Sequence, residues 1–136
     1  MQKYLQCFES TADCIEIADV GALDVQTALI HADIMLTDYS SVFFDFTYML
    51  KPQIYCQFDL ETFRSTQYGE GYFSFEQNGF GEVCRTQEEI LAVLERILVA
   101  GGEMAPLYRE RATAFFALRD HNNCERNFRA IQELMN

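Results

Sequence analysis

The chain has 136 residues, of which 49% are hydrophobic and only two are proline, which is enough to bury the core of one domain. Its 21 acidic residues outnumber its 10 basic residues, and the formal charge of -11 disfavours nucleic acid and anionic lipid as partners over most of the surface. Any phosphate group must therefore be held by local groups. The sequence has no signal-peptide pattern and no apolar run near the roughly 18 residues of a membrane span, so we expect no transmembrane segment.

The five cysteines are odd in number and widely spaced, and none forms a C-x-x-C pair. Such spacing favours neither a disulfide framework nor a zinc site. We expect buried thiols in a reducing cytosol, no metal ion and no cofactor.

The first half of the chain alternates between expected strands and helices. Short apolar segments predict strands at 14–17, 33–36 and 53–56. Two helices are expected between these strands. The first covers 24–32 with Asp24 as its cap, and the second is a buried helix over 41–50 that ends before Lys51-Pro52. This alternation predicts right-handed crossovers and a parallel sheet.

The second half begins with an aromatic and glycine-rich segment, 58–81, which indicates an ordered surface excursion. Val83-Cys84 predicts a short fourth strand, and the capping box that starts at Thr86 predicts a helix to about Val99. Gly101-Gly102 ends that helix, Pro106 begins another to about Leu118, and residues 120–123 cap a last helix. We therefore expect an α/β fold in which residues 1–136 form a single three-layer Rossmann-like domain.

The turn between the second strand and the buried helix carries the chemistry. Thr37, Ser40 and Ser41 place hydroxyl groups where the first backbone N–H groups of a helix lack partners, which suits a diphosphate. Asp45 follows one helical turn later and could accept hydrogen bonds from a ribose diol. Two alternatives remain: the hydroxyl residues could merely cap the helix, and Asp45 could be an acid satisfied by a neighbouring turn.

The run Ala32-Asp33-Ile34-Met35-Leu36-Thr37-Asp38-Tyr39-Ser40-Ser41-Val42-Phe43-Phe44-Asp45 resembles the signature of the CDP-glycerol glycerophosphotransferases. The resemblance continues over nearly the whole chain, through Lys51-Pro52, Gly71-Tyr72-Phe73, Thr86-Gln87-Glu88-Glu89-Ile90, Asp120 and Glu125-Arg126. Members of this family have a GT-B architecture of two Rossmann-like halves. The resemblance implies that this chain is the C-terminal, donor-binding half.

The resemblance also implies a reaction, namely transfer of glycerol phosphate from CDP-glycerol to a teichoic-acid-like polymer with release of CMP. Thr37, Ser40 and Ser41 would bind the diphosphate, and Asp45, seven residues before Pro52, would bind the ribose. Four further residues would support the site, namely Asp38, Tyr39, Asp120 and Arg126.

The family's expected base is a histidine in a His-Pro motif upstream, and no His-Pro occurs here. The chain is therefore expected to be catalytically incomplete, and its polyol-phosphate or glycan-lipid acceptor would bind through the missing half. The parent protein would be cytoplasmic and peripheral on the cytoplasmic face of the membrane. The chain departs from the family pattern at His121, which replaces a glycine, and at Phe80-Gly81-Glu82, which replaces Pro-Gly-Pro.

Other functions remain open. A related polymerase could use CDP-ribitol with the same donor half. A non-catalytic flavodoxin-like module could instead bind a partner through its acidic face, with no nucleotide. Arg126 could form an exposed ion pair with Glu125 or Asp120 in place of a phosphate contact.

Overall fold

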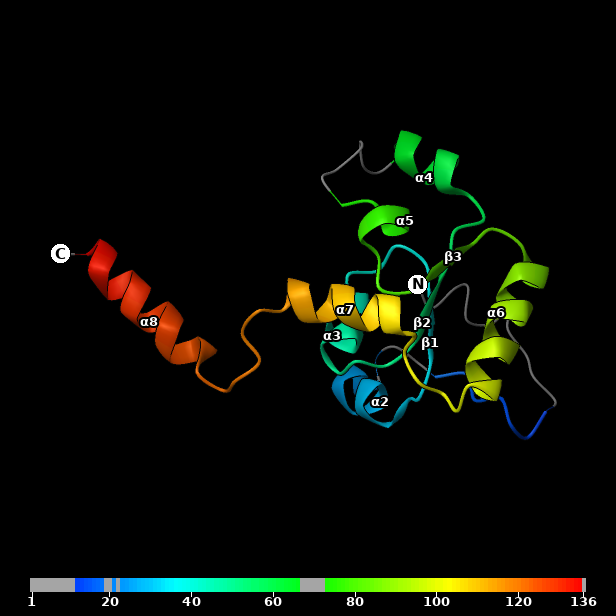
Figure 1. The fold of residues 1–136 in the computed structure, drawn as a ribbon, viewed down its shortest axis with the longest axis horizontal. Helices are drawn as coiled ribbons and strands as arrows, with labels where there is room; N and C mark the ends of the chain where they lie inside the picture. The colour runs from blue at the N-terminus through cyan, green and yellow to red at the C-terminus, as the bar shows by residue number, and fades with distance from the viewer. Residues whose placement is uncertain (1–11, 19–20, 22, 67–72, 136) are drawn as a thin grey trace. The chain divides into compact units, whose positions relative to one another are not determined.

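The computed structural model describes residues 12–18, 21, 23–66 and 73–135. The chain divides into two compact units, Met1–Asp33 and Ile34–Asn136. The second unit holds a parallel sheet in the order β1-β2-β3, formed by Met35–Thr37, Gln53–Cys56 and Glu82–Cys84 (Figure 1). The predicted α/β, Rossmann-like fold with a parallel sheet is confirmed.

The first unit contains helix α2, Val25–His31, close to its predicted position. Asp24 caps it as predicted, because its carboxylate accepts hydrogen bonds from the Gln26 N–H at 3.2 Å and the Thr27 hydroxyl at 2.5 Å. At the other end, the His31 Nδ1–H donates to the Thr27 carbonyl at 3.0 Å. The histidine therefore closes the end of the helix.

The strand expected at 14–17 is wrong, because residues 12–18 form no strand. Ile15 and Ile17 are 58% and 42% exposed. The alternating apolar pattern here is that of a half-buried strand, but a strand also needs a neighbouring strand for its backbone hydrogen bonds. The described residues supply none to this segment.

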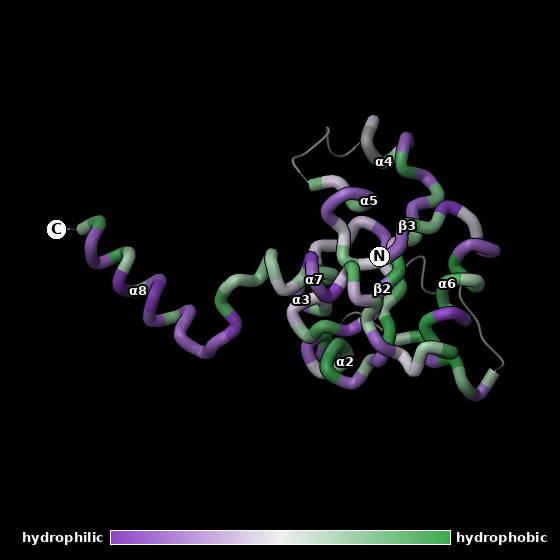
Figure 2. Tube along the Cα trace, viewed as in Figure 1, coloured by the Kyte–Doolittle hydropathy of each residue, from purple (hydrophilic) through white to green (hydrophobic). Residues whose placement is uncertain are grey.

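Helices cover both faces of the sheet in the second unit. Because successive residues of β2 point to opposite sides, each face has its own packed core. Tyr55 packs with Phe43, Phe80, Met104 and Ala112, on the side of α3, Phe43–Tyr48, and α7, Pro106–Phe115. Ile54 packs toward α6, Gln87–Val99, on the other side, in a cluster completed by Cys84, Ile90 and Val93. Figure 1 shows these three layers. In Figure 2 the hydropathy colours differ along β2, although most of this strand is buried.

The predicted limits of the later helices follow local signals. Thr86 accepts the Glu89 N–H at 3.2 Å at the start of α6, while the Glu89 carboxylate accepts the Arg85 N–H at 2.6 Å. Gly101 and Gly102 end α6 with φ of 85° and 75°, a conformation that glycine adopts without strain. Pro106 occupies the first turn of α7, which ends at Phe115, three residues earlier than expected.

The segment 58–81 is only partly the surface excursion that the sequence predicts. It contains two short helices, α4, Leu60–Thr66, and α5, Phe75–Asn78, and residues 67–72, with Gly71 and Tyr72, lie outside the described ranges. Phe80 is fully buried against Phe43 and Phe73. The aromatic residues of this segment thus build the core on the α3 face.

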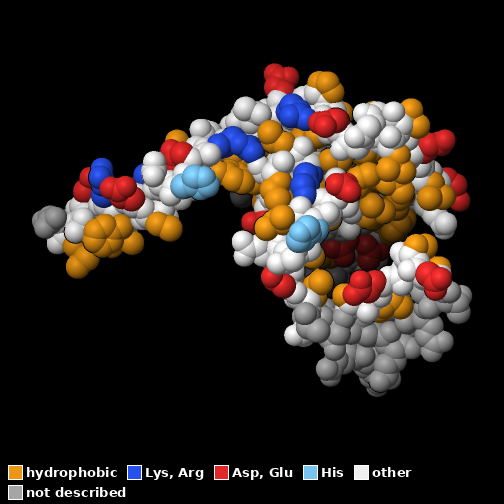
Figure 3. Space-filling view, turned by 90° about the horizontal axis from the view of Figure 1, so that it is seen from below, with side chains coloured by type: hydrophobic (Ala, Val, Ile, Leu, Met, Phe, Trp, Pro, Cys, Tyr) orange, Lys and Arg blue, Asp and Glu red, His pale blue; other side chains and the backbone are white. Residues whose placement is uncertain are grey.

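The last helix, α8, Asn123–Leu134, has no buried residue. Its apolar side chains gather on one side and its charged side chains on the other (Figure 3). Three of its apolar residues, Phe128, Ile131 and Leu134, are largely exposed, as is Met135 directly after it. In the described ranges, no helix has the length and apolarity needed to cross a membrane.

The expectation of buried thiols holds for only part of the set. Cys84 is buried and Cys56 is half-buried, but Cys14 and Cys124 are exposed, and Cys7 lies outside the described residues. All four described cysteines are free thiols. The prediction was wrong for Cys14 and Cys124 because neither belongs to a strand or to a buried helix face.

Candidate functional site

The candidate turn lies beyond the carboxyl end of β1. Thr37 is the last residue of that strand and is half-buried, whereas Ser40 and Ser41 are exposed. Helix α3 begins at Phe43, two residues later than expected, and ends at Tyr48. It ends there because Leu50 takes a left-handed φ of 58° immediately before Lys51-Pro52.

Ser40 and Ser41 present open hydrogen-bond donors at this turn. Their carbonyl groups accept the Phe43 N–H at 3.4 Å and the Phe44 N–H at 3.1 Å, which closes the turn. Neither hydroxyl group caps α3, and neither serine donates a hydrogen bond to another described residue. The capping alternative therefore does not describe this turn. Because α3 has only six residues, its dipole adds little, and the N–H and O–H groups are the donors that an anion would meet.

Asp38 makes a hydrogen bond within the turn, and Tyr39 connects the turn to the segment that follows β2. The Asp38 carboxylate accepts the Tyr39 N–H at 2.6 Å. Burial, and after it the charge of Asp38, raise the pKa of the Cys56 thiol on β2. The Tyr39 hydroxyl donates to Asp59 at 3.2 Å, and its ring stacks on Phe63 with centroids 3.8 Å apart. Both residues thus fix the position of the turn.

Asp45 lies on the outer side of α3. The residues that α3 buries are Phe43, Phe46 and Thr47, whereas Asp45 is exposed and makes no hydrogen bond or ion pair with a described residue. No neighbouring turn in the described part of the chain satisfies this acid. An exposed carboxylate needs no partner, so its openness permits a ligand contact without requiring one.

Asp120 and Arg126 pair with each other. Two hydrogen bonds of 2.8 and 3.1 Å join the guanidinium to the carboxylate. These bonds, followed by the Asn122 N–H, lower the pKa of Asp120 to about 2. Nearby, Arg119 donates to the Tyr48 carbonyl and lies over the Tyr48 ring. Among the described residues, no hydrogen bond or ion pair joins Asp120 or Arg126 to the turn at 37–41.

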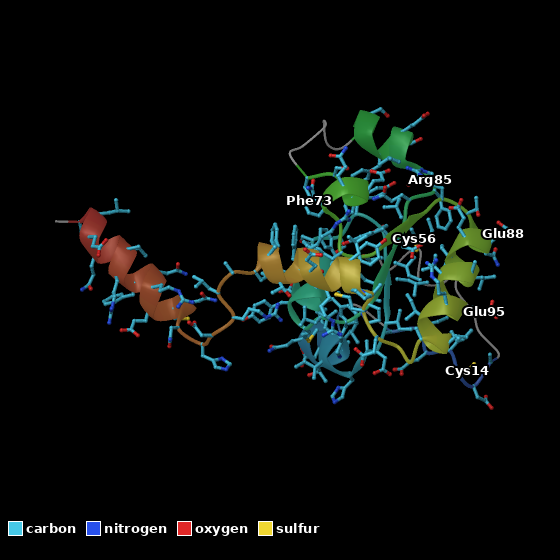
Figure 4. All side chains as sticks on the ribbon, in the orientation of Figure 1. Cys14, Cys56, Phe73, Arg85, Glu88 and Glu95 are labelled. Atoms are coloured by element: carbon cyan, nitrogen blue, oxygen red, sulfur yellow. The ribbon has the colours of Figure 1, made fainter. Side chains whose placement is uncertain are left out.

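A polar pocket of about 470 Å³ lies past the carboxyl ends of β2 and β3, where Figure 4 labels Cys56 and Arg85. Its lining residues are Gln57, Phe58, Asp59, Leu60, Glu61, Thr62 and Arg85. Gln57 is only 2% exposed, and its Nε2 has no hydrogen-bond partner among the residues that the structure describes. Sequence analysis missed this residue, although its place directly after β2, at the same edge as Thr37, was a usable signal.

A second pocket of about 440 Å³ lies at the opposite, amino end of the strands. It is mainly apolar and lies between α6 and α7, with the ion pair of Glu82 and Arg96 in its wall. This pocket is therefore separate from the candidate turn, which lies at the carboxyl edge of the sheet. No group of three or more His, Cys, Asp or Glu residues suited to a metal ion occurs in the described part of the chain.

Residues 2–133 match the family described as CDP-glycerol:poly(glycerophosphate) glycerophosphotransferase. The chain belongs to this family. It is 35% identical over 91% of its length to the minor teichoic acid biosynthesis protein GgaB of Bacillus subtilis. It is also 36% identical over 54% of its length to a teichoic acid poly(glycerol phosphate) polymerase of that organism. The teichoic acid ribitol-phosphate polymerase TarL of Staphylococcus aureus is 26% identical over 95% of the chain.

The aligned regions span 13%, 10% and 20% of the lengths of these three relatives. The chain therefore corresponds to a small part of each of them. No solved structure matches the chain.

One departure from the glycerophosphotransferase pattern is explained by packing. At Phe80-Gly81-Glu82, the phenylalanine ring enters the core and Glu82 begins β3. A Cβ atom on Gly81 would lie 2.0 Å from the Gln53 carbonyl oxygen, so only glycine fits there. The middle residue of the family's Pro-Gly-Pro thus keeps a structural role in this family member.

Proposed function

We propose that this chain is the donor-binding part of a glycerophosphotransferase and that the turn at 37–41, with Asp45, binds CDP-glycerol. The observation that carries the proposal is the set of donors on Ser40 and Ser41 that have no partner among the described residues. They lie beyond the carboxyl end of β1, which is where parallel α/β sheets bind their ligands. Membership of the family supports the choice of ligand.

Each residue has a distinct role in this proposal. The hydroxyl and N–H groups of Ser40 and Ser41, with the Thr37 hydroxyl, bind the diphosphate oxygens. Asp45 accepts hydrogen bonds from the ribose 2′- and 3′-hydroxyl groups, one helical turn after Ser41. Asp38 and Tyr39 keep the turn in place through their bonds to each other and to Asp59.

The transfer forms a bond between an acceptor hydroxyl oxygen and the phosphorus that carries glycerol. The bond from this phosphorus to the bridging oxygen breaks, and CMP leaves with the electron pair. Donors at Ser40 and Ser41 stabilise the negative charge that develops on CMP. The base that removes the acceptor proton belongs to another part of the parent protein, which also binds the acceptor. This chain alone therefore binds the donor without transferring glycerol phosphate.

The parent protein, on this proposal, works as a peripheral protein at the cytoplasmic face of the membrane. Its nucleotide donor is water-soluble, and its acceptor is a growing polyol phosphate or glycan carried by a lipid. The donor half needs no contact with the bilayer. Its acidic surface would be repelled by anionic lipid.

A second donor, CDP-ribitol, is favoured by one observation. The relative TarL is named a ribitol-phosphate polymerase, and it aligns with 95% of the chain. The two donors share the cytidine, ribose and diphosphate groups that the turn and Asp45 would bind. They differ only at the polyol end, so competition between them would identify the preferred donor.

Isothermal titration calorimetry with CDP-glycerol tests the proposal. We expect binding to the 136-residue chain and a loss of at least about tenfold in affinity in Asp45→Ala, because a hydrogen bond to a charged group contributes about 1.5–3 kcal/mol. Ser41→Ala combined with Asp45→Ala should weaken binding further. Asp33→Ala is the matched control, since Asp33 is an exposed acid that precedes β1 at its other end.

Two outcomes would contradict the proposed donor site. Absence of binding by CDP-glycerol, CDP-ribitol and CDP would reject the donor site and favour the flavodoxin-like interaction module. A thermal-shift screen gives an independent reading, because a ligand at a hundred times its dissociation constant stabilises the folded state by about 2.7 kcal/mol. Equal affinity in the wild type and the double variant would move the site away from this turn.

A further inference from the structure

The polar pocket past β2 and β3 contains a buried group that lacks a partner. The Gln57 N–H donates to the Cys84 carbonyl at 2.8 Å, which extends the pairing of β2 with β3, and Gln57 lines the pocket together with residues 58–62. The residue is 2% exposed, and its Nε2 donates to no acceptor in the described ranges. Rotating the amide would place the oxygen in this buried position, where it would need a donor in place of an acceptor.

This pocket adjoins the candidate diphosphate turn. Asp59, in its wall, accepts the hydrogen bond of the Tyr39 hydroxyl, and Tyr39 immediately precedes Ser40. Asp38 lies close enough to Cys56, the last residue of β2, for its charge to act on that thiol. A ligand bound at Ser40 and Ser41 can therefore extend past the end of β2 into the pocket.

The charges of the pocket favour an uncharged ligand with hydroxyl groups. Asp59 and Glu61 contribute two acids, whereas the Arg85 guanidinium is held by Glu76 at 2.6 Å. A further phosphate would be repelled by the two acids. A hydroxyl group, by contrast, can accept from Gln57 and donate to a carboxylate at the same time.

The order of the chemical groups along the donor indicates which of its hydroxyl groups would reach the pocket. In a CDP-polyol, the diphosphate separates the ribose from the polyol. With the ribose at Asp45 on α3 and the diphosphate at the turn, the group that continues beyond β2 is the polyol. We propose that the pocket binds the polyol end of the donor and that Gln57 determines the preference for a polyol-bearing nucleotide. This proposal rests on the donor-binding function proposed above.

Titration of the wild type and Gln57→Met with CDP-glycerol, CDP-ribitol and CDP tests the assignment. Wild-type protein should bind its preferred CDP-polyol about tenfold or more tightly than CDP. In Gln57→Met the ratio should fall to about one, with the affinity for CDP changed by less than about twofold. Gln77→Met on α5 is the matched control, because Gln77 is exposed and lies outside the pocket.

The variant's folding is checked by thermal unfolding without ligand. Methionine has a similar length and replaces an unpaired buried amide with an apolar group, so the midpoint should equal or exceed that of the wild type. A midpoint several degrees lower would show that the amide has a partner, which would overturn the argument from the unpaired Gln57 side chain.

Three binding results separate failure of this assignment from failure of the donor site. No binding by any of the three nucleotides would reject both. Equal wild-type affinities for CDP and the CDP-polyols, or a ratio that survives Gln57→Met, would reject the polyol pocket and leave the donor site standing. An equal loss of affinity for CDP and the CDP-polyols would show that the pocket holds the nucleotide, which also rejects the polyol assignment.

Discussion

Tyr55 is fully buried, and its hydroxyl oxygen accepts hydrogen bonds from the Phe80 N–H at 3.2 Å and the Gln53 amide at 2.9 Å. Burial raises the pKa of this phenol, which keeps the side chain neutral. We expect Tyr55→Phe to lower the free energy of unfolding by about 1–3 kcal/mol, because it leaves a buried backbone donor unpaired. Gln53 would keep its bond to Thr47. Urea unfolding measures the loss.

The control for this substitution is Tyr108→Phe on α7. Tyr108 is half-buried, and no hydrogen bond from its hydroxyl group occurs among the described residues. Its stability should change by less than about 0.5 kcal/mol. Equal losses in the two variants would show that the phenol ring and its solvation, and not the two accepted bonds, account for the effect at Tyr55.

The cysteines should divide by their reactivity. Cys14 and Cys124 are exposed, whereas burial raises the pKa of both Cys56 and Cys84. Since the thiolate is the reactive form, we expect iodoacetamide to modify the two exposed thiols at least about tenfold faster at pH 8. Peptide mass spectrometry over time gives the four rates. Rapid modification of Cys84 under native conditions would contradict its burial between β3 and α6.

Gln57 shows why residue type alone does not identify the whole candidate site. The hydroxyl groups of Ser40 and Ser41 could be placed because a strand and a helix predict the turn between them. The burial of Gln57 depends on the loop 58–62 and on Arg85, which is distant in sequence. A glutamine after a strand is ordinarily a surface residue, so residue type alone gave no reason to select it.

At the scale of elements, local signals predicted helix limits well. Asp24, Thr86, Gly101 and Pro106 each act within a few residues of their own position, and each marks a helix end in the structure. The strand expected at 14–17 failed because a strand depends on a partner elsewhere in the chain. Helix α4 was missed because its Phe63 packs on Tyr39, a residue far away in the sequence. Such a contact leaves no periodic pattern of apolar residues in the helix itself.

The start of α8 should respond to acid. The Asp120 carboxylate accepts hydrogen bonds from Arg126 and, at 2.9 Å, from the Asn122 N–H, and together these lower its pKa to about 2. This pKa in the folded state is below the ordinary aspartate value of 3.8. The stabilisation is therefore complete above about pH 4 and is lost as the pH falls toward 2. The amide chemical shift of Asn122 should titrate with a midpoint of about 2.

Asp120→Asn provides the control, since it removes the titrating group but keeps an oxygen that can accept the Asn122 N–H. The acid transition of the Asn122 amide should disappear in this variant. A midpoint near 3.8 in the wild type would mean that Arg126 does not hold the carboxylate in solution. Arg126 would then be available for another contact, including the donor phosphate that the family resemblance implies.

At the scale of the whole molecule, charge and architecture impose different demands. The three-layer core places the ends of β1, β2 and β3 at one edge, where a ligand can contact several loops. The formal charge of -11 opposes any anionic ligand that approaches this edge. Neutral donors at Ser40 and Ser41 can still bind an anion there. A short N–H or O–H hydrogen bond acts at close range, where the repulsion from the net charge of the chain matters least.

This arrangement predicts an unusual response of donor binding to salt. A phosphate site built from lysine or arginine weakens as salt screens its ion pairs. Here the turn at 37–41 contains no basic residue, and the long-range term is repulsive. Raising the ionic strength from about 20 to about 300 mM shortens the screening length from about 20 to about 6 Å. We expect the dissociation constant of CDP-glycerol, measured by calorimetry, to stay constant or decrease.

Arg85→Gln should show the same trend, because Arg85 is paired with Glu76. Affinity that falls about tenfold with salt in the wild type, but not in Arg126→Gln, would instead show that Arg126 leaves Asp120 to bind the diphosphate.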